Sequence, residues 1–225
     1  MPMSKPAPLS YPLISVVVAT NNAGKISEFR ELLADLPIEW LRTSDVMDAP
    51  LHVIENGDTF EQNAILKARA ACVATGYAAV ADDSGLEVDA LSGRPGVRSA
   101  RYAHELADDN ENNLALLAAL AEVKDADRAA RFRCALALVT PFEYDPLLAF
   151  GTCEGRIARQ PRGQGGFGYD PLFLVNSCSD RSMAELEAFE KNRVSHRGQA
   201  VNNLRPRLIQ LIASMVRQLG PPIAG

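Results

Sequence analysis

The chain has 225 residues, a length that suits one large domain or one domain with a smaller lobe. Its 47% hydrophobic and 23% charged residues are typical of a folded globular protein and exclude a disordered chain. With 28 acidic against 23 basic residues, the formal net charge of -5 argues against nucleic acid or an anionic membrane surface as a partner.

The four cysteines form no CxxC pair and have no neighbouring histidine at metal-ligand spacing. We therefore expect free thiols in a reducing compartment and no structural zinc site. The apolar stretch 13–19 is too short to span a bilayer, and no signal-peptide cleavage site follows it, so a cytoplasmic protein is expected. Residues 1–12 contain four prolines and are predicted to form a flexible arm outside the fold.

The first predicted unit is a strand, a loop and a helix. Residues 13–19 are rich in β-branched side chains without polar alternation, which predicts a central strand buried on both faces. Residues 25–36 place apolar side chains on one helical face, and Pro37 is expected to end that helix. A second helix is predicted over 58–75, because it opens on a capping-box pattern and Gly76 follows as a stop.

The middle of the chain is predicted to alternate between strands and helices. A short strand at 78–81 runs into an acidic segment, 82–85, whose composition is typical of a turn. A helix is predicted over 109–123. The segments 131–140 and 147–153 then indicate an antiparallel pair of strands.

The C-terminal third begins with a glycine-rich loop, 163–168, that opens onto a strand at 172–175. A short helix is expected over 183–190, and a longer one begins at Ser195. Pro206 is predicted to kink that helix or split it in two. The mixture of strands and helices indicates an α/β fold with a mixed sheet.

The loop after the first strand is a candidate phosphate site. Ligands of α/β proteins bind beyond the carboxyl ends of strands, and a helix N-terminus offers free N–H groups to phosphate. The loop is not a Walker A motif, because Ala19 stands where glycine is needed and Ile26 where Ser or Thr is needed. A capped turn with an exposed lysine is the alternative. The loop consists of Thr20, Asn21, Asn22, Ala23, Gly24 and Lys25.

The acidic segment offers two candidate groups for metal or acid–base chemistry. Mg²⁺ is held by one or two protein carboxylates, and a carboxylate also activates water. Because successive side chains of an extended segment point to opposite sides, Asp82 and Asp83 are not expected to serve one site. An acidic turn is the alternative. Asn63 and Lys67 share one helical face, which taken alone indicates a solvated face.

Two further motifs point to ligand contacts. Residues 163–168 match GxGxxG but precede a strand, so no dinucleotide site is expected. The segment is interpreted as a loop that approaches a planar ligand, with Phe167 available for stacking, or as a plain flexible hairpin loop. Ser195 is the predicted N-cap of the last helix. His196 and Arg197 then lie in the first turn, where their positive charge opposes the helix dipole. Such an arrangement is expected where they serve a ligand, and a structural histidine is the alternative.

Taken together, these segments resemble the inosine triphosphate pyrophosphatase family, whose members hydrolyse non-canonical purine nucleoside triphosphates. The resemblance implies an elongated two-lobed α/β fold around a central mixed β-sheet, with residues 13–220 as one catalytic domain and a homodimer as the usual assembly. It also implies Mg²⁺-dependent cleavage of ITP, dITP and XTP to nucleoside monophosphate and pyrophosphate. The motifs occur in the family's order and are ATNNAGK (19–25), ENGDTF (55–60), NAILKA (63–68), ADDSGL (81–86), PG (95–96) with SARY (99–102), GGFGYDP (165–171) and SHRG (195–198).

The resemblance also assigns roles to single residues. It implies that the triphosphate is held by the first loop, through Thr20, Asn22 and Lys25. It makes Asp83 the catalytic carboxylate, which binds the metal and activates water. Three further residues are assigned roles beside Asp83. The resemblance implies that Glu55 helps to hold the metal, that Lys67 neutralises phosphate charge, and that Ser84 contacts the substrate.

The implied base pocket combines the glycine-rich loop with the last two helices. Its residues are Phe167, Gly168, Tyr169 and Asp170, with Lys191, His196 and Arg197 reading the purine. Donors from the last three meet a 6-oxo group, whereas adenine presents a 6-amino donor and leaves buried groups unpaired, at roughly 1–3 kcal/mol each. Two alternatives stay open: a septum-formation-type pyrophosphatase for modified pyrimidine nucleotides, and a nucleotide-binding module without catalysis.

Overall fold

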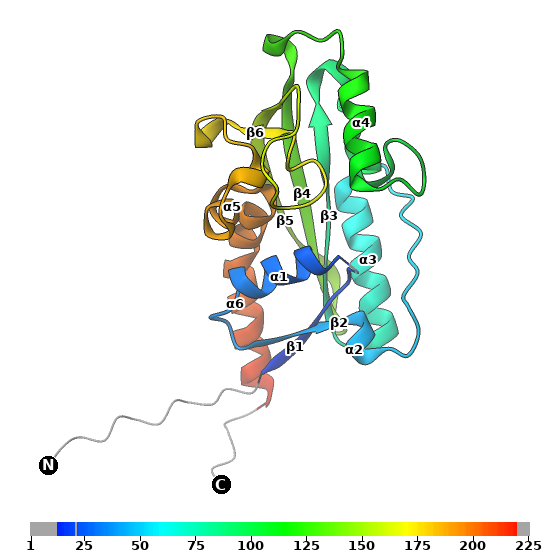
Figure 1. Ribbon diagram of the computed structural model, residues 1–225. Helices are drawn as coiled ribbons and strands as arrows, with labels where there is room; N and C mark the ends of the chain where they lie inside the picture. Colours follow the sequence, from blue (N-terminus) through cyan, green and yellow to red (C-terminus); the bar gives the residue numbers. More distant parts are fainter. Residues whose placement is uncertain (1–12, 21, 220–225) are drawn as a thin grey trace, which may run out of the picture.

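The computed structural model describes residues 13–20 and 22–219, and its centre is one six-stranded mixed sheet (Figure 1). The strand order is β2-β1-β3-β4-β5-β6, with β1 parallel to β2 and β3 and the remaining neighbours antiparallel. The mixed sheet and the antiparallel pair β4–β5 confirm the predictions. The strands are β1 (Ile14–Val18), β2 (Ile38–Arg42), β3 (Ala78–Val88), β4 (Ala129–Thr140), β5 (Glu143–Ile157) and β6 (Phe173–Val175).

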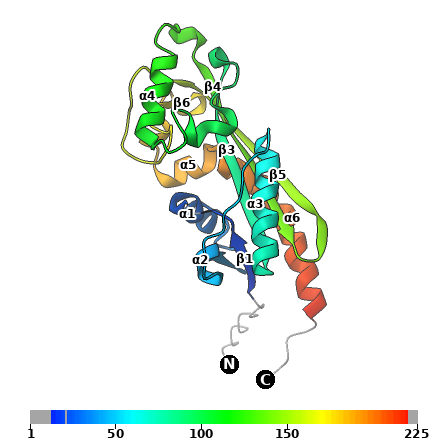
Figure 2. The ribbon, with the colours of Figure 1, turned by 90° about the vertical axis from the view of Figure 1, so that its right-hand side faces the viewer.

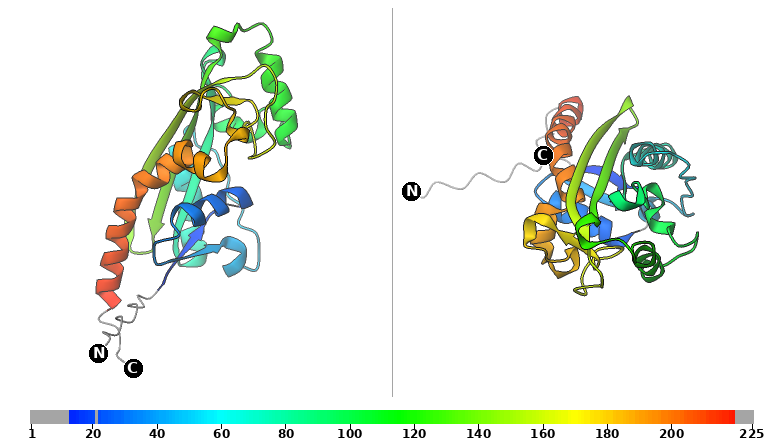
Figure 3. Two further views of the ribbon diagram at one scale, coloured as in Figure 1. Left: turned by 60° about the vertical axis from the view of Figure 1, so that its left-hand side comes forward. Right: turned by 90° about the horizontal axis from the view of Figure 1, so that it is seen from above.

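Helices cover both faces of the sheet. α3 packs against one face, and α1 and α6 pack against the other, so that the sheet lies between α3 and α6 when the molecule is seen from above (Figure 3). The helices are α1 (Ala23–Leu32), α2 (Thr43–Val46), α3 (Phe60–Thr75), α4 (Asp109–Ala119), α5 (Ala188–Val194) and α6 (His196–Leu219). Short 3₁₀ helices are η1 (Asp89–Leu91), η2 (Gly96–Arg101), η3 (Asp125–Asp127), η4 (Asn176–Cys178) and η5 (Met183–Glu185).

The first strand is an interior strand, as its apolar run predicts. Val18 contributes to the core beneath α1 and α6, whereas Val17 contributes to the core beneath α3. The face of α3 that meets the sheet is built of small side chains, Ala64, Ala68 and Ala71, none of which has exposed surface. Small side chains allow a helix to lie close to the strands, and this brings the polar residues of α3 near β3.

A further core extends the molecule along the strands. It lies where β3, β4 and β6 meet α4, which are close together in Figure 2. Its residues include Leu86, Leu116 and Phe173. The buried side chain of Arg128 closes its outer end by donating to the backbone carbonyls of Leu120, Ile157 and Ala158 at 2.7, 2.8 and 3.1 Å. The molecule is therefore elongated, with α4 and α2 at opposite ends of β3.

The largest correction to the predictions is in β3. The predicted strand 78–81 and turn 82–85 are one continuous strand of 11 residues. β3 pairs with β4 from Ala79 to Val88, and Asp82 and Asp83 lie opposite Leu136 and Ala135. The ladder hydrogen bonds of a long antiparallel partner outweigh the turn preference of the Asp-Asp-Ser-Gly composition.

Several element boundaries also differ. α1 ends at Leu32 rather than at residue 36, and the N-cap of α3 is Thr59, whose hydroxyl accepts from the Gln62 N–H, rather than Asp58. The segment predicted as a helix over 183–190 is divided between η5 and α5. β2 and α2, which follow Pro37, were not predicted. Gly76 does end α3, with a left-handed φ of 73°.

α6 continues through Pro206 as one helix, so of the two predicted outcomes, a kink or a split, the split is wrong. The apolar side chains on both sides of the proline, including Val201, Leu204 and Leu208, are buried against the sheet. Packing of this face holds the helix together although the proline has no N–H to donate. Figure 3 shows α6 running along the sheet as one long element.

All four cysteines are free, as predicted. Cys72, Cys134 and Cys153 are buried, and Cys178 is half-buried. Among the residues that the structure describes, no helix has both the length and the apolar character needed to cross a membrane. The predicted arm, residues 1–12, lies outside the described residues.

Candidate active site

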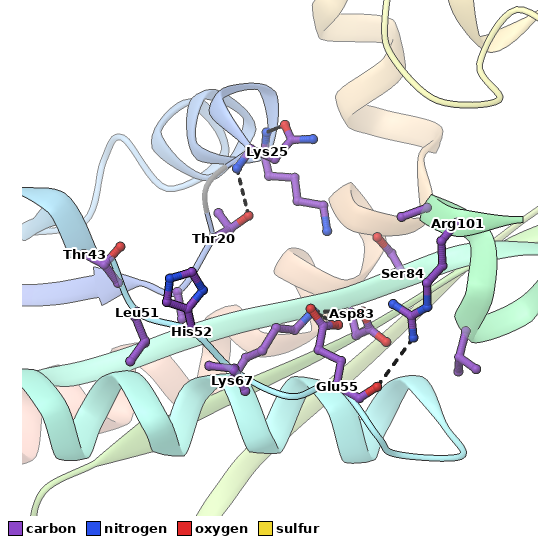
Figure 4. Close-up of a pocket in the computed structure, with 15 residues that line it drawn as sticks. Thr20, Lys25, Thr43, Leu51, His52, Glu55, Lys67, Asp83, Ser84 and Arg101 are labelled. Atoms are coloured by element: carbon purple, nitrogen blue, oxygen red, sulfur yellow. Dashed lines mark hydrogen bonds and ion pairs between the residues drawn. The ribbon is translucent and has the colours of Figure 1, made fainter. Parts of the chain in front are cut away.

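Two adjoining cavities lie beside the middle of β3. The larger cavity, of about 460 Å³, lies between the β1–α1 loop, α3 and η2 (Figure 4). The smaller cavity, of about 150 Å³, lies beneath the glycine-rich loop and the start of α6. The two share part of their lining, namely Asn22, Lys25, Ser84 and Ala100.

The β1–α1 loop forms one wall of both cavities. The side chain of Asn22 caps α1 by accepting from the Lys25 N–H at 3.1 Å, and the Asn22 N–H donates to the Thr20 hydroxyl at 3.1 Å. Gly24 allows a close approach, since a Cβ there would lie 3.3 Å from the ring of Phe167. Ala23 begins α1, and Asn21 lies outside the described residues. The loop thus combines the N-terminus of α1 with polar side chains.

Asp83 lines the larger cavity and is held from α3. Its two carboxylate oxygens accept from Lys67 Nζ at 2.9 Å and from Asn63 Nδ2 at 3.2 Å. Lys67 also donates to Glu55 at 3.0 Å. Asn63 and Lys67 share one face of α3, as predicted, but this face points at β3, so its interpretation as a solvated face is wrong. Because the alanines of α3 pack closely on the sheet, Asn63 and Lys67 lie beside β3.

The pKa values of this pair are shifted by burial and by charge. Burial raises the pKa of Asp83, and the positive charge of Lys67 offsets this only in part. Burial acts to lower the pKa of Lys67, but the carboxylates of Asp83, Asp82 and Glu55 outweigh it and raise that pKa. Lys67 is therefore a firmly protonated donor, and Asp83 is a stronger base than an exposed aspartate.

Asp82 points to the opposite side of β3, as predicted for neighbouring residues of an extended segment. Its side chain is fully buried and contacts Lys25 Nζ at 2.8 Å and Arg197 Nη2 at 2.9 Å. Burial acts to raise its pKa, but Lys25, Arg197 and Lys67 hold that pKa well below its ordinary value. Asp82 is thus a fixed anion between two cations, and it does not line either cavity.

Arg197 lies in the first turn of α6, and each of its three guanidinium nitrogens donates at least one hydrogen bond. It donates to Glu28 and Asp82 and, at 3.1 Å, to the Ser84 hydroxyl. Glu28 also pairs with Lys191 at 3.0 Å, and Lys191 in turn contacts Asp170 at 3.0 Å. The carboxylates offset the unfavourable position of a cation at a helix N-terminus.

His196 is buried next to Arg197 and lines the smaller cavity. Its ring stacks on Phe132 at 4.7 Å between centroids, and burial lowers its pKa well below the ordinary value. The imidazole is therefore neutral near pH 7, and its Nδ1 has no hydrogen-bond partner among the described residues. Ser195 caps the helix as predicted, accepting from the Gly198 N–H at 3.1 Å. Gly151 on β5 makes room for this helix start, because a Cβ there would lie 2.0 Å from the His196 carbonyl oxygen.

The glycine-rich loop is fixed at several points, unlike a plain flexible hairpin. Asp170 accepts from the Phe167 N–H at 3.0 Å, and Asn113 donates to the Gly168 carbonyl at 3.0 Å. The Tyr169 hydroxyl donates to the Ser99 carbonyl at 2.9 Å, so this buried ring supports the loop. These contacts place the ring of Phe167 over the smaller cavity, with Lys191 Nζ 4.6 Å from its centroid.

The best candidates for holding a metal ion are Asp83 and Glu55, which both line the larger cavity and both contact Lys67. Across the described ranges, no three His, Cys, Asp or Glu side chains are grouped so that they could hold a metal by themselves. Two carboxylates are a donor set that suits Mg²⁺ when phosphate oxygens and water complete its coordination. The side chains present thus fit a magnesium ion that is shared with a phosphate ligand.

The structure brings the described residues of the predicted site around the two cavities. Sequence reasoning missed several contacts of this site. Asn63 pairs with Asp83, Glu28 pairs with Lys191, and Asp82 pairs with Arg197. Arg101 lines the larger cavity. Glu28 carried a weak signal, because it lies one helical turn after Lys25. His52 also lines the larger cavity.

Comparisons with known proteins agree with this arrangement. The chain is 49% identical over 198 residues to a dITP/XTP pyrophosphatase of Thioalkalivibrio sulfidiphilus (strain HL-EbGR7), covering 87% of this chain and 98% of that protein. It is 45% identical to the dITP/XTP pyrophosphatase of Bacillus subtilis (strain 168), covering 84% and 93%. A solved structure of a HAM1 protein from Coxiella burnetii superposes with a TM-score of 0.78 at 45% identity, covering 88% of this chain and 100% of that one. Residues 16–207 match the model of the Ham1 family, and the chain belongs to this family.

Proposed function

We propose that this chain hydrolyses non-canonical purine nucleoside triphosphates (ITP, dITP and XTP) to the nucleoside monophosphate and pyrophosphate, with Mg²⁺ as cofactor. The observation that carries the proposal is the position of Asp83, a buried carboxylate with a raised pKa in a cavity lined by lysines and a helix N-terminus. Next to it lies a smaller cavity covered by an aromatic ring. The names of the relatives, dITP/XTP pyrophosphatases, support the same activity.

The two cavities match the two parts of a nucleotide. The larger cavity suits the phosphates, because Thr20, Asn22 and Lys25 surround a helix N-terminus that favours anions. The smaller cavity suits the base, because Phe167 offers a ring for stacking and Lys191 and His196 offer polar atoms at its wall. The sugar and the first phosphate then lie near the shared lining, beside Ser84.

Asp83 is proposed as the base that takes a proton from the attacking water. Its raised pKa brings its basicity closer to what proton transfer near neutral pH requires. Asn63 and Lys67 fix its orientation through one hydrogen bond to each oxygen. The water attacks the first phosphorus, the bond to the bridging oxygen breaks, and pyrophosphate leaves as one unit. Lys67 and Lys25 stabilise negative charge on the phosphates during this step.

Asp83 and Glu55 would hold the Mg²⁺ ion. When bound, such an ion supplies positive charge that neutralises phosphate oxygens and helps to lower the pKa of a nearby water. Both carboxylates retain acceptor capacity beyond their contacts with Lys67, which supports this assignment.

The base-reading role is assigned to Lys191 and His196 directly. Lys191 is a donor suited to a 6-oxo group, and the unpaired buried Nδ1 of His196 supports a ligand contact at this wall. Each guanidinium nitrogen of Arg197 already donates to Glu28, Asp82 or Ser84, so we assign Arg197 the positioning of its neighbours.

We further propose a homodimer that acts in the cytoplasm, as the sequence resemblance implies. The four free thiols support a reducing compartment. Light scattering on the purified chain tests the assembly, and a monomeric mass would refute it.

The activity is tested by incubating the chain with ITP, dITP, XTP and ATP, with and without Mg²⁺, and identifying the products. We expect inosine monophosphate and pyrophosphate from ITP, much slower cleavage of ATP and no turnover without metal. Release of orthophosphate alone would overturn the proposal. Preferential cleavage of modified pyrimidine nucleotides would favour the septum-formation-type alternative, and tight binding without turnover would favour a non-catalytic module.

A further inference from the structure

Arg101 ends η2, and its guanidinium points into the larger cavity toward Asp83 and Glu55 (Figure 4). It enters from the wall opposite Thr20 and His52. Its Nη2 lies 3.5 Å from the backbone carbonyl oxygen of Glu55, and about a quarter of the side chain is exposed. The guanidinium is thus within the cavity and accessible from it.

The support of Arg101 is rigid. The hydroxyl of Ser99 accepts from the Leu86 N–H of β3 at 2.8 Å and donates to the Gly96 carbonyl at 2.7 Å. Gly85 lets η2 lie directly on the strand, because a Cβ there would be 2.4 Å from the Ser99 hydroxyl. The strand that carries Asp83 therefore also fixes the position from which Arg101 reaches the cavity.

Arg101 differs from the lysine side chains that line the larger cavity. Among the described residues these are Lys25 and Lys67, and each is paired with a mostly buried carboxylate, Asp82 or Asp83, at 2.8 or 2.9 Å. The carboxylate partner of Arg101 is Glu105, which is 70% exposed and lies 3.4 Å away. Exposed pairs of this kind are weak, so the charge of Arg101 remains available to an anion in the cavity.

We propose that Arg101 binds the part of the substrate that leaves as pyrophosphate, by donating from its guanidinium to the non-bridging phosphate oxygens. This proposal rests on the proposed function. Ala100 and Ser84 line both cavities and mark the level of the first phosphate, whereas Arg101 lines the larger cavity alone. Its fork of N–H donors suits phosphate, and charge that builds up on the leaving group strengthens the contact.

The test compares Arg101→Gln and Arg101→Lys with the matched control Arg98→Gln. Arg98 lies on the same 3₁₀ helix and pairs with the same Glu105, but it does not line the larger cavity. The readouts are kcat/KM for ITP with Mg²⁺ and calorimetric binding of inorganic pyrophosphate without metal, with thermal unfolding as a check of the fold.

We expect Arg101→Gln to lower kcat/KM and pyrophosphate affinity by roughly 10- to 100-fold each, and Arg101→Lys to lower both less, because it keeps the charge but loses the fork. Arg98→Gln should match the wild type. Equal pyrophosphate affinity in Arg101→Gln and Arg98→Gln would overturn the proposal, even if turnover fell, since the residue would then act only through Glu55. If the wild type does not form pyrophosphate from ITP, the proposed function fails, and pyrophosphate binding still decides whether Arg101 is an anion ligand.

Discussion

The two neighbouring aspartates of β3 are expected to respond in opposite ways to the same substitution. Asp82→Asn removes a buried anion that contacts Lys25 and Arg197, whose side chain is only 1% exposed. Breaking a buried ion pair by removing one partner costs about 3–5 kcal/mol. Arg197 keeps its contact with Glu28, and Lys25 is partly exposed. We therefore expect the free energy of unfolding to fall by about 3 kcal/mol, the lower end of this range.

Asp83→Asn should leave stability nearly unchanged but strongly reduce turnover. Burial already raises the pKa of Asp83, so a neutral side chain removes an unfavourable buried charge, while Lys67 retains Glu55. We expect a change in the free energy of unfolding within about 1 kcal/mol. Loss of the proposed base should reduce kcat by a factor of roughly 100 or more.

Urea unfolding and thermal melting of the wild type and of both variants measure how much stability each substitution removes. For a chain of this size, 3 kcal/mol corresponds to a decrease in Tm of roughly 6–12 °C for Asp82→Asn. The pKa of Asp82 is lowered in the fold, so its stabilising effect is present above its ordinary value of 3.8 and is lost as the pH falls below that value. The difference in the free energy of unfolding between the wild type and Asp82→Asn should therefore become smaller in acid. Equal destabilisation by the two substitutions would refute the reasoning.

Three further predictions concern packing and thiol reactivity. Gly151→Ala places a Cβ against the His196 carbonyl oxygen and should lower the free energy of unfolding, measured with urea, by about 2–3 kcal/mol. An unchanged urea midpoint would mean that α6 shifts freely to make room for the methyl group. Arg128→Lys loses most of the contacts to three buried carbonyls and should cost at least about 2 kcal/mol, which the same assay measures. Burial raises the pKa of the Cys134 thiol to about 12, so a thiol reagent at pH 8 should modify Cys178 first, with mass spectrometry locating the label; rapid labelling of Cys134 in the native protein would contradict its burial.

Local patterns in the sequence predicted much of the fold because their signals are short-range. The β-branched run of β1, the stop of α3 at Gly76 and the cap of α6 at Ser195 all depend on neighbours in the chain. The continuity of β3 depends instead on β4, which lies about 50 residues further along. A turn-like composition therefore indicated a turn where a long partner strand imposes an extended ladder.

The candidate site shows the same division. The β1–α1 loop was identified from its place at the end of a strand, and the opposite orientation of Asp82 and Asp83 follows from strand geometry. The contacts of Lys67 could not be derived in this way. Its face of α3 has the appearance of a solvated face until the helix is packed on the sheet, and only tertiary structure decides which side of a helix is buried.

The alternation along β3 restricts how the length of this strand can change. Inserting or deleting one residue between Ala78 and Asp82 would exchange the sides, turning Asp83 away from Lys67 and turning Asp82 and Ser84 away from Arg197. Inserting or deleting two residues would leave each aspartate on its present side of β3 and would change only its position along the strand. We therefore expect single-residue length changes to be absent from this segment in functional homologues, even where individual side chains are replaced.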